Sequence, residues 1–482
     1  MLIQTDPRRR LSGALLLPLA LAVSALPGCA VDPARDDATI LASVPAEELS
    51  RAATLESQGK SGEAAGHYLA LAGKVRGQAR IQLEVRAARA YLAAGRVAQV
   101  QKIAAALAGQ ELTAAQRAEL RTLTAESDRL ARESAASGYA AGDRVTVLLP
   151  RGGRFAPAAK AIREGIEAAS RADAGATQPR LEFVDAGRTR DIARRAATGG
   201  AGYLIGPLEK EAVDRLLVGP PLRVPTLALN EATREDRTAA NLYQFSLSPE
   251  NEAIEVANQA YAAGLRGALL MTPGGAWSDR LANAFRRRWR ALGGTLAGQI
   301  GYNPSGAGVE KSLQKTLQAA RADFVFLVAT ADTARKLYPR IRPIAEQGHL
   351  MVVSSSHVYP GAFDARRDAG LVGLHFVDIP WMFDIGRGAL PRPGGSDALT
   401  RLYAMGIDAY RLAPRLATLS ANRGYYPGQT GELSIDARGR LHRQLVLGRF
   451  TATGPRPADW FGWNERSGTS QGVTGSVAGD GG

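Results

Sequence analysis

The stretch RVTVLLPRGGRFAPAAKAIREGIEAA, residues 144–169, determines the predicted fold class. Residues 145–149 form a continuous apolar run, which is typical of a strand buried on both faces. The two glycines at 152–153 allow a turn, and Ile162 and Ile166 then recur at a four-residue spacing that predicts a helix. A buried strand that leads directly into a helix is the repeating unit of a parallel sheet with crossover helices.

The same unit continues along the chain and predicts two α/β lobes, at 143–246 and at about 247–360. Further buried strands are expected at 181–184, 203–205, 226–229, 268–271, 324–328 and 350–353. Helices are expected at 210–217, 249–263, 278–292 and 332–344. A later helix at 399–418 and a hairpin at 432–448 indicate that the chain crosses between the lobes again.

A different pattern precedes the lobes. From residue 46 to 133, small and apolar residues recur every three or four positions, which predicts an all-α domain. Gly59 and Gly95 each separate two helical patterns and lie 36 residues apart, close to the period of tetratricopeptide repeats. The large aromatic and proline positions of that repeat are incomplete, so a simple helical bundle is the alternative. A stretch of small residues from 133 to 143 is expected to link this domain to the lobes.

The N-terminus carries the pattern of an export signal. Three arginines at 8–10 precede an apolar run at 11–26, and the sequence Leu-Pro-Gly-Cys then ends at Cys29, the only cysteine of the chain. This ending resembles the bacterial lipobox. The resemblance implies that residues 1–28 are a lipoprotein signal peptide and that the thiol of Cys29 receives a lipid. A plain secretory signal with an incidental cysteine is the alternative.

The residues after Cys29 favour one membrane over the other. Residues 29–45 are expected to form a tether. Ala30 and Val31 follow Cys29, so the acidic residue that often retains lipoproteins at the inner membrane is absent from these positions. We therefore expect the protein to be anchored to the outer membrane by lipid and to face the periplasm.

The chain is strongly basic. Its 482 residues hold 60 Lys and Arg against 46 Asp and Glu, which gives a formal net charge of +14. Such a charge is typical of nucleic-acid binding, but export argues against a nucleic-acid partner. Anionic lipid surfaces, cell-wall polymer and acidic partner proteins remain. Because the arginines are spread along the sequence, a compositional bias of the genome is the alternative explanation.

Several segments in order carry a resemblance to a known family. They are VLLPRGGRFA (147–156), AIREG (161–165), IGPL (205–208), VPTLALN (224–230), LSPE (247–250), SSHVY (355–359), DIPW (378–381) and MGIDAY (405–410). The two lobes resemble a type I periplasmic-binding-protein fold, and the segments together resemble the LppC/LpoA family of penicillin-binding protein activators. The resemblance covers residues 143–452 and implies an α/β, two-lobed fold of that type, preceded by the all-α, tetratricopeptide-like domain.

The resemblance implies a function without catalysis. It implies an outer-membrane lipoprotein that binds and stimulates a class A penicillin-binding protein in peptidoglycan synthesis, with peptidoglycan itself as a further partner. The alternative is a solute-binding lipoprotein of a transporter, which captures an amino acid or a muropeptide between the lobes; Ser246 and Ser248 are further polar residues for such a cleft. A hydrolase acting on the cell wall is the third interpretation.

Four positions stand out as site candidates. Asn230 and the pair Ser355 and His357 follow buried strands, where ligands of open α/β sheets bind, and are candidate cleft residues. Hydroxyls that satisfy loop amides are the plainer interpretation of the serines, because no acid partner or nucleophile elbow is evident. Trp381 is the candidate partner contact, since tryptophan offers a large contact area. A tryptophan in the core of the crossover is its alternative.

Asp408 and the five histidines are further residues with ionisable side chains. Asp408 is expected to be partly buried on its helix and paired with an arginine such as Arg411. None of the five histidines has another histidine four residues away, so no metal site and no cofactor are predicted. Residues 465–482 are rich in Gly and Ser and are predicted to be a disordered tail.

Overall fold

The computed structural model describes residues 39–58, 60–135, 138–173, 178–186, 202–234, 236–388, 390–393, 399–422, 424–458 and 460. The predicted signal peptide, Cys29 and the tail at 465–482 lie outside the described residues. Within the described part of the chain, no helix combines the length and the apolar character that crossing a membrane requires.

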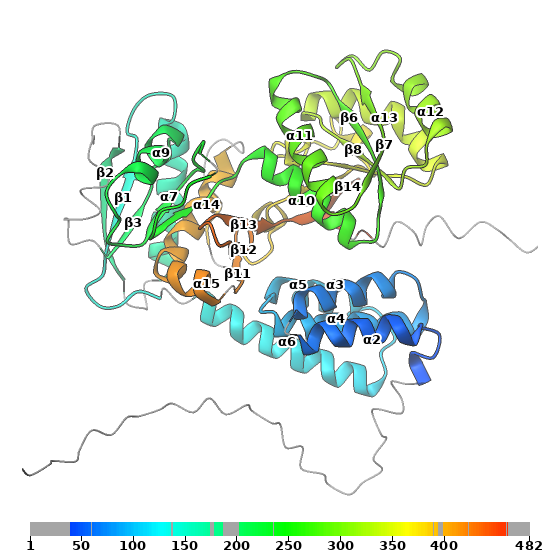
Figure 1. Ribbon diagram of the computed structural model, residues 1–482, viewed down its shortest axis with the longest axis horizontal. Helices are drawn as coiled ribbons and strands as arrows, with labels where there is room; N and C mark the ends of the chain where they lie inside the picture. Colours follow the sequence, from blue (N-terminus) through cyan, green and yellow to red (C-terminus); the bar gives the residue numbers. More distant parts are fainter. Residues whose placement is uncertain are drawn as a thin grey trace, which may run out of the picture.

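Among the described residues the N-terminal part contains helices α2 to α6, and Figure 1 shows them side by side below the two lobes. Alanines that are fully buried, such as Ala64 and Ala88, leave little space between neighbouring helices. This part occupies the range for which the sequence predicts helices. The helices are α2 (Ala46–Ser57), α3 (Ser61–Ala72), α4 (Gly77–Ala93), α5 (Val97–Leu107) and α6 (Ala114–Ala135).

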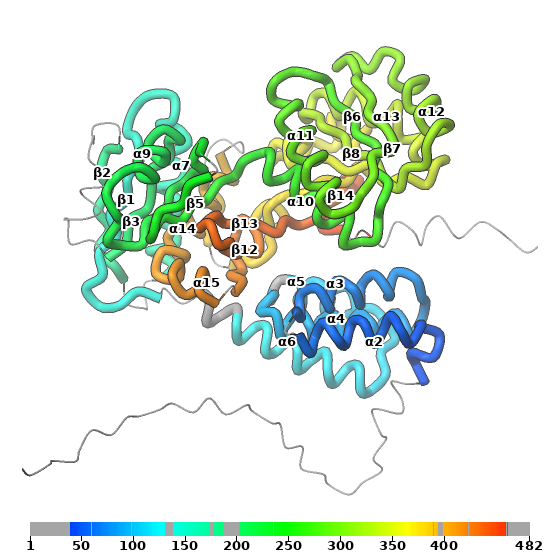
Figure 2. The backbone as a smooth tube through the Cα atoms, in the orientation of Figure 1, coloured from blue at the N-terminus to red at the C-terminus, as the bar shows by residue number. Residues whose placement is uncertain are grey.

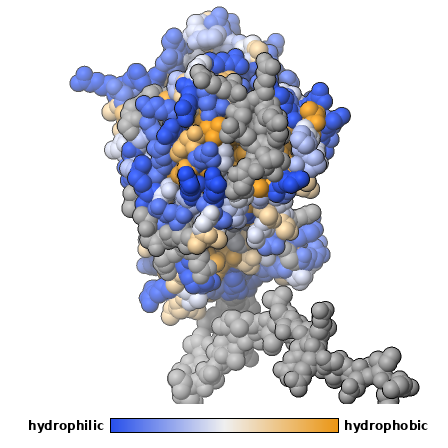
Figure 3. Space-filling view, turned by 90° about the vertical axis from the view of Figure 1, so that its left-hand side faces the viewer, coloured by the Kyte–Doolittle hydropathy of each residue, from blue (hydrophilic) through white to orange (hydrophobic). Residues whose placement is uncertain are grey.

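Lobe 1 is built on a parallel sheet with the strand order β2-β1-β3-β4-β5. Its core strand β1 is buried along all but its first residue, as the continuous apolar run predicts. Figure 3 shows the side of the molecule on which lobe 1 lies, where hydrophilic residues prevail. The elements are β1 (Arg144–Leu149), α7 (Ala156–Ala172), β2 (Arg180–Asp185), β3 (Tyr203–Ile205), α9 (Lys210–Val218), β4 (Thr226–Ala228) and β5 (Leu242–Gln244).

Lobe 2 repeats this topology. Its five parallel strands follow the order β7-β6-β8-β9-β10, which is the order of lobe 1, and the antiparallel strands β14 and β15 extend the sheet beyond β10. The strands are β6 (Gly267–Thr272), β7 (Thr295–Gly301), β8 (Phe324–Leu327), β9 (Met351–Ser354), β10 (His375–Asp378), β14 (Val446–Thr451) and β15 (Gly454–Pro457).

Helices cover both faces of the lobe 2 sheet. Ala268 and Leu270 of β6 pack on one face with Phe285 and Trp289, whereas Leu269 belongs to a second cluster on the other face. This alternation follows from the two-residue period of a strand. The helices are α10 (Pro249–Ala262), α11 (Ala276–Ala291), α12 (Val309–Ala319) and α13 (Ala331–Gln347).

A third, antiparallel sheet lies between the lobes. It contains β11 (Tyr426–Gly428), β12 (Gly431–Ile435) and β13 (Leu441–Gln444). The predicted hairpin is confirmed by the pairing of β12 with β13. The expected single strand through residue 447 is divided, because β13 ends in the third sheet and β14 begins in lobe 2.

The later helices return to lobe 1. These are α14 (Thr400–Leu412) and α15 (Leu416–Asn422). Helix α14 packs against α7 of lobe 1 at a very close crossing: a Cβ atom on Gly406 would lie 2.1 Å from the carbonyl oxygen of Ile162, and one on Gly165 would lie 2.0 Å from that of Tyr403. Glycine is required at both positions because any side chain would separate the helices.

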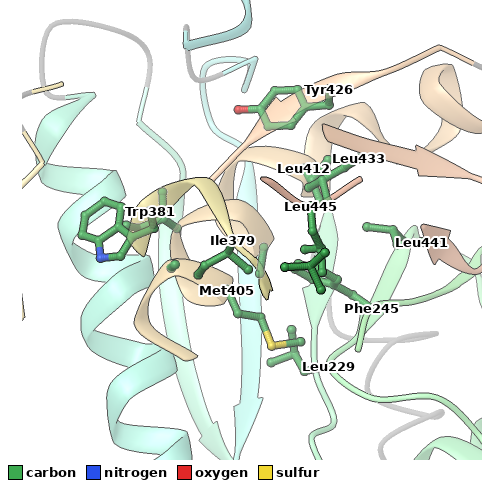
Figure 4. Close-up of a cluster of buried hydrophobic side chains, with 14 of the residues drawn as sticks. Leu229, Phe245, Ile379, Trp381, Met405, Leu412, Tyr426, Leu433, Leu441 and Leu445 are labelled. Atoms are coloured by element: carbon green, nitrogen blue, oxygen red, sulfur yellow. The ribbon is translucent and has the colours of Figure 1, made fainter. Parts of the chain in front are cut away.

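Three chain segments join the lobes, and they can be followed in Figure 2. They contain Phe245 after β5, Ile379 after β10 and Leu445 between β13 and β14. All three side chains are almost completely buried and belong to one apolar cluster, part of which is drawn in Figure 4. We call these three residues the crossover cluster. It holds the connections between the lobes against the end of lobe 1.

Candidate functional site

Charged groups gather beside the crossover cluster. Asp378 is the last residue of β10 and Arg401 lies in the first turn of α14. Arg401 donates from Nε to Oδ1 of Asp378 over 2.8 Å and from Nη2 to the carbonyl of Tyr359 over 2.8 Å. Asp378 is only 1% exposed, and burial raises the pKa of its carboxyl despite the opposing effect of Arg401. This pair joins the sheet of lobe 2 to a helix that packs on lobe 1.

A second buried carboxylate belongs to Glu252 in the first turn of α10. It accepts hydrogen bonds from the backbone amide of Ser356 over 3.0 Å and from the Ser356 hydroxyl over 2.8 Å. Burial alone would raise the pKa of Glu252, but His357 and the guanidinium groups of Arg443 and Arg401 lower it below its ordinary value. Glu252 therefore remains ionised and clamps the loop after β9 to α10.

The predicted pair Ser355 and His357 lies at this clamp. The Ser355 hydroxyl is 3.2 Å from Nδ1 of His357, and an oxygen of Glu252 lies 3.7 Å from the same nitrogen. A serine–histidine–acid relay needs the serine and the acid on opposite nitrogens of the imidazole. Ser355 is also fully buried. The three groups form a structural network, and their geometry does not support the hydrolase interpretation at this position.

Asn230 lies apart from that pair, on the loop after β4. Its amide donates to the carbonyl of Leu208 over 3.0 Å, and its oxygen accepts from the backbone of Glu231 over 3.0 Å. Glu231 in turn accepts from the side chain of Asn251 on α10 over 2.9 Å, which links the loop to lobe 2. No hydrogen bond between Asn230 and Ser355 is found among the described residues.

The two additional serines also bond within the protein. The hydroxyl of Ser246 accepts from the amide of Ser248 over 3.1 Å. The hydroxyl of Ser248 accepts from the amide of Asn251 and caps α10. Asn230, Ser246, Ser248 and Ser355 thus all make hydrogen bonds inside the protein. The polar side chains that were candidates for solute recognition instead form hydrogen bonds that hold loops in place.

Trp381 was expected to contact a partner, and this expectation is wrong. The side chain is completely buried, and its ring lies 5.6 Å from that of Tyr403. Pro380 begins a 3₁₀ turn, η4 (Pro380–Phe383), that directs the indole into the core, as Figure 4 shows. The alternative, a tryptophan in the core of a crossover, is the observed one.

Asp408 is completely buried but does not pair with Arg411. Its carboxylate accepts from the amides of Gln429 and Thr430, each over 2.7 Å, and from the Thr430 hydroxyl over 2.6 Å. Burial raises the pKa of Asp408 to about 6 against these hydrogen bonds. Arg411 pairs instead with Asp173, at 3.4 Å, because the side chains of 408 and 411 leave α14 toward different neighbours. Asp408 therefore anchors the turn between β11 and β12.

The contact between the helical part and the lobes was not predicted from the sequence. Arg96, between α4 and α5, donates to the hydroxyl of Tyr425 over 2.8 Å and to the side chain of Gln444 over 3.0 Å. Its guanidinium also lies 4.4 Å from the centre of the Tyr425 ring. A lone arginine after a helix-ending glycine carries no distinctive pattern. The contact nevertheless fixes the helical part to the third sheet, beside the crossover cluster.

No group of three or more His, Cys, Asp or Glu side chains within the described residues is arranged to hold a metal ion. The contacts described above are buried ion pairs and hydrogen bonds that hold loops. Such an arrangement can hold two lobes and a helical part in a fixed relation.

The chain is similar in sequence and in fold to several known proteins. A family model described as "LppC putative lipoprotein" matches residues 139–452. The penicillin-binding protein activator LpoA of Photobacterium profundum is 30% identical over 353 residues, which are 66% of this chain and 57% of that protein. LpoA of Haemophilus influenzae is 32% identical over 266 residues, which are 53% of this chain and 45% of that protein. The chain thus spans about half the length of the curated relatives it matches.

Solved structures agree with the predicted fold class. The C-domain of Haemophilus influenzae LpoA, described as a regulator of PBP1A, is 28% identical with a TM-score of 0.57, and the match covers 66% of this chain and all of that domain. Full-length LpoA from the same organism is 22% identical with a TM-score of 0.56, and the match covers 86% of this chain and 88% of that chain. The similarity of fold therefore extends beyond the lobes into the helical part.

A third structure comes from Chromobacterium violaceum and is described as a "putative branched-chain amino acid ABC transporter". It is 32% identical with a TM-score of 0.55, over 64% of this chain and 99% of that chain. The predicted fold, two periplasmic-binding-protein-like lobes preceded by an all-α part, is thus confirmed. Since the family match covers more than half of the 482 residues and runs through both lobes, the chain belongs to the LppC lipoprotein family.

Proposed function

We propose that this protein is an outer-membrane-anchored lipoprotein that binds and stimulates a class A penicillin-binding protein during peptidoglycan synthesis. The observation that carries the proposal is the match, over the full length of that domain, to the C-domain of an LpoA described as a regulator of PBP1A. The relatives named penicillin-binding protein activators support it. The protein itself forms and breaks no bonds in this proposal.

The candidate cleft residues agree with a binding role toward a protein. The polar side chains of Asn230, Ser246 and Ser355 are committed to internal hydrogen bonds. A solute that needed these groups in another orientation would have to break those bonds before it gained new ones. A partner that binds the outer surface of the lobes does not meet this cost. Stimulation then requires that the protein bind the active conformation of the synthase more tightly than the inactive one.

A rate measurement tests the proposal. The chain from residue 29 onward, with a Cys29→Ser change to prevent acylation, is added to the purified class A penicillin-binding protein of the same genome with lipid II as substrate. We expect the polymerisation rate to rise by about fivefold or more, the lower end of typical coupling between two states. An unchanged rate at saturating protein would contradict stimulation.

The membrane anchor has its own test. Cells that express the unaltered protein are labelled with palmitate and fractionated, and cells with the Cys29→Ser variant serve as the control. We expect label and protein in the outer-membrane fraction only when Cys29 is present, because several acyl chains hold a protein firmly to a bilayer. Label in the variant, or unlabelled wild-type protein, would contradict the anchor.

A solute-binding lipoprotein of a transporter is the second candidate, and one observation favours it. The Chromobacterium violaceum structure that shares 32% identity is described as a branched-chain amino acid transporter component. Calorimetric titration with leucine, valine and a muropeptide separates the candidates. Saturable heat with any of the three, together with an unchanged synthase rate, would establish the transporter role in place of the activator role.

A further inference from the structure

Helix α11 of lobe 2 carries an unusual density of positive charge. The sequence Phe-Arg-Arg-Arg-Trp-Arg at 285–290 places four arginines within five consecutive positions. Phe285 and Trp289 are fully buried against the sheet, so the arginines occupy the outer side of the helix. Figure 1 shows α10 and α11 on one side of the lobe 2 strands, with α12 and α13 on the other.

A fifth arginine lies at the end of this helix. Arg266 precedes β6, and its guanidinium is 3.7 Å from the centre of the Tyr261 ring. The Tyr261 ring in turn contacts Trp289 of α11, with the ring centres 6.0 Å apart. We call these five residues, Arg266, Arg286, Arg287, Arg288 and Arg290, the arginine face.

The arginine face is held by neutral acceptors. Arg286 donates to the side-chain oxygen of Gln299 over 2.7 Å, and Arg288 donates to that of Asn258 over 2.6 Å. Arg266 donates to two backbone carbonyls, at 2.7 and 2.8 Å. Within the described part of the chain, no carboxylate lies within 4.0 Å of any of the five guanidinium groups.

Other arginines of lobe 2 form ion pairs with carboxylates. Arg280, nearly two turns before Arg286 on α11, pairs with Glu250 at 2.6 Å, and Arg335 pairs with Asp368 at 2.7 Å. The favourable interaction of cations with a helix C-terminus accounts for Arg288 and Arg290 in the last turn. It does not account for Arg286, Arg287 or Arg266. The amide and carbonyl acceptors orient the guanidinium groups without cancelling their charge.

We propose that the arginine face is the docking surface for a carboxylate-rich surface of the partner protein. The inference rests on the proposed function, in which that partner is a class A penicillin-binding protein. Guanidinium groups bind carboxylates through two parallel hydrogen bonds, and groups that are already oriented lose less entropy on binding. The net charge of +14 adds a long-range attraction to an acidic partner.

A protein partner fits this surface better than a lipid bilayer does. Helices that bind at a bilayer surface insert large apolar side chains beside their cations. Among the described residues the exposed large hydrophobic side chain is Val218, which ends α9 in lobe 1. The outer side of α11 therefore offers charge without an apolar insertion.

Charge reversal tests the proposal. Arg287→Glu with Arg290→Glu changes two arginines whose side chains hold no neighbour in place among the described residues. The matched control is Arg366→Glu with Arg367→Glu, two exposed arginines of the same lobe, which alters the net charge equally. Affinity for the purified class A penicillin-binding protein is measured by biolayer interferometry at low and high salt. We expect the α11 variant to bind about tenfold more weakly at low salt and the control to stay within about twofold.

Three results would overturn the proposal, and they differ in what else they contradict. Equal affinities of the wild type and the α11 variant contradict the docking surface and leave the proposed function intact. A wild type that does not bind the synthase contradicts both. If the variant loses binding to phosphatidylglycerol vesicles or to isolated sacculi but keeps its affinity for the synthase, the surface serves lipid or cell wall instead.

Discussion

Arg401 and Arg287 carry the same guanidinium group in opposite surroundings. Arg401 lies in the interior, where it forms two hydrogen bonds with the buried carboxylate of Asp378 and the carbonyl of Tyr359. Arg287 is exposed on α11 and has no carboxylate within 4.0 Å among the described residues. The interior charges of the crossover are compensated and hold the lobes together. The charges of the arginine face are uncompensated and remain available to a partner. The two regions should therefore respond differently to mutation.

The largest expected loss of stability comes from the interior pair. Arg401→Ala leaves the carboxylate of Asp378 buried without its ion partner, which typically costs about 3–5 kcal/mol. Urea denaturation monitored by tryptophan fluorescence measures the loss. Arg387→Ala is the control, because Arg387 pairs with Asp384 at a more exposed site, where such pairs contribute about 1 kcal/mol or less. Similar losses in both variants would remove the contrast between interior and surface charge.

The second prediction concerns pH and Asp408. Its pKa of about 6 in the folded chain exceeds the ordinary value of 3.8, so the folded protein holds a proton that the unfolded chain has released. This contribution to stability is fully present below about pH 4 and is lost as the pH rises to about 6. It amounts to about 3 kcal/mol at most, for a shift of roughly two pKa units.

The variant Asp408→Asn isolates this effect because it removes the titrating group. Unfolding free energies of the wild type and the variant are measured from pH 4 to pH 7. We expect the stability of the wild type, relative to the variant, to fall across this range. A constant difference between the two proteins would show that the folded pKa of Asp408 is not raised.

The third prediction concerns the attachment of the helical part. Arg96→Ala removes two hydrogen bonds and the contact with the Tyr425 ring, a loss of about 1–3 kcal/mol. Hydrogen exchange of the amides in β11 and β13 should become faster. Arg89→Ala is the control, since Arg89 pairs with Glu119 inside the helical part. Equal exchange in both variants would mean that Arg96 does not fix the helices to the third sheet.

The smallest change in stability is expected at the arginine face. Arg287→Glu with Arg290→Glu should lower the unfolding free energy by about 1 kcal/mol, because Arg290 lies in the last turn of α11 and a glutamate there loses the favourable interaction of a cation with the helix C-terminus. Thermal unfolding measured beside the binding experiment provides the check. A large loss of stability would place these arginines with the interior charges, and the comparison between the two regions would fail.

The sequence predicts most of the parallel strands, including the edge strand β2, expected at 181–184, but the buried strands β5 and β10 are absent from the prediction. Strands such as β1 and β8 are continuous apolar runs and lie where they were expected. Strand β7 was missed because it lies at the edge of its sheet and is mostly not buried, so its residues, TLAGQIG, show no clear apolar period. The division between β13 and β14 at Leu445 was missed as well, since no glycine or proline between residues 441 and 447 marks the point where the chain leaves one sheet for the other.

The site was less predictable than the fold because its residues are distant in the chain. Ser356 and the Glu252 that binds it are 104 residues apart, and no local spacing reveals such a pair. Trp381 shows the other limit: the type of residue indicates a contact area, but burial depends on how the turn at Pro380 directs the ring. The arginine run of α11 stands in the sequence, although the spread of arginines along the chain predicted no basic surface there. Its lack of carboxylate partners became evident only from the fold.

The close crossing of α7 and α14 has a consequence for how the molecule is made. The strands of lobe 1 are complete at residue 244, but the helix that covers its face begins at Thr400. A growing or emerging chain therefore has the five parallel strands of lobe 2, which end at Asp378, available before lobe 1 can close. Both lobes are finished only by the C-terminal part of the chain, since β14 and β15 of lobe 2 follow α14, and a fragment cut after Asp378 would leave the face of α7 that carries Gly165 bare.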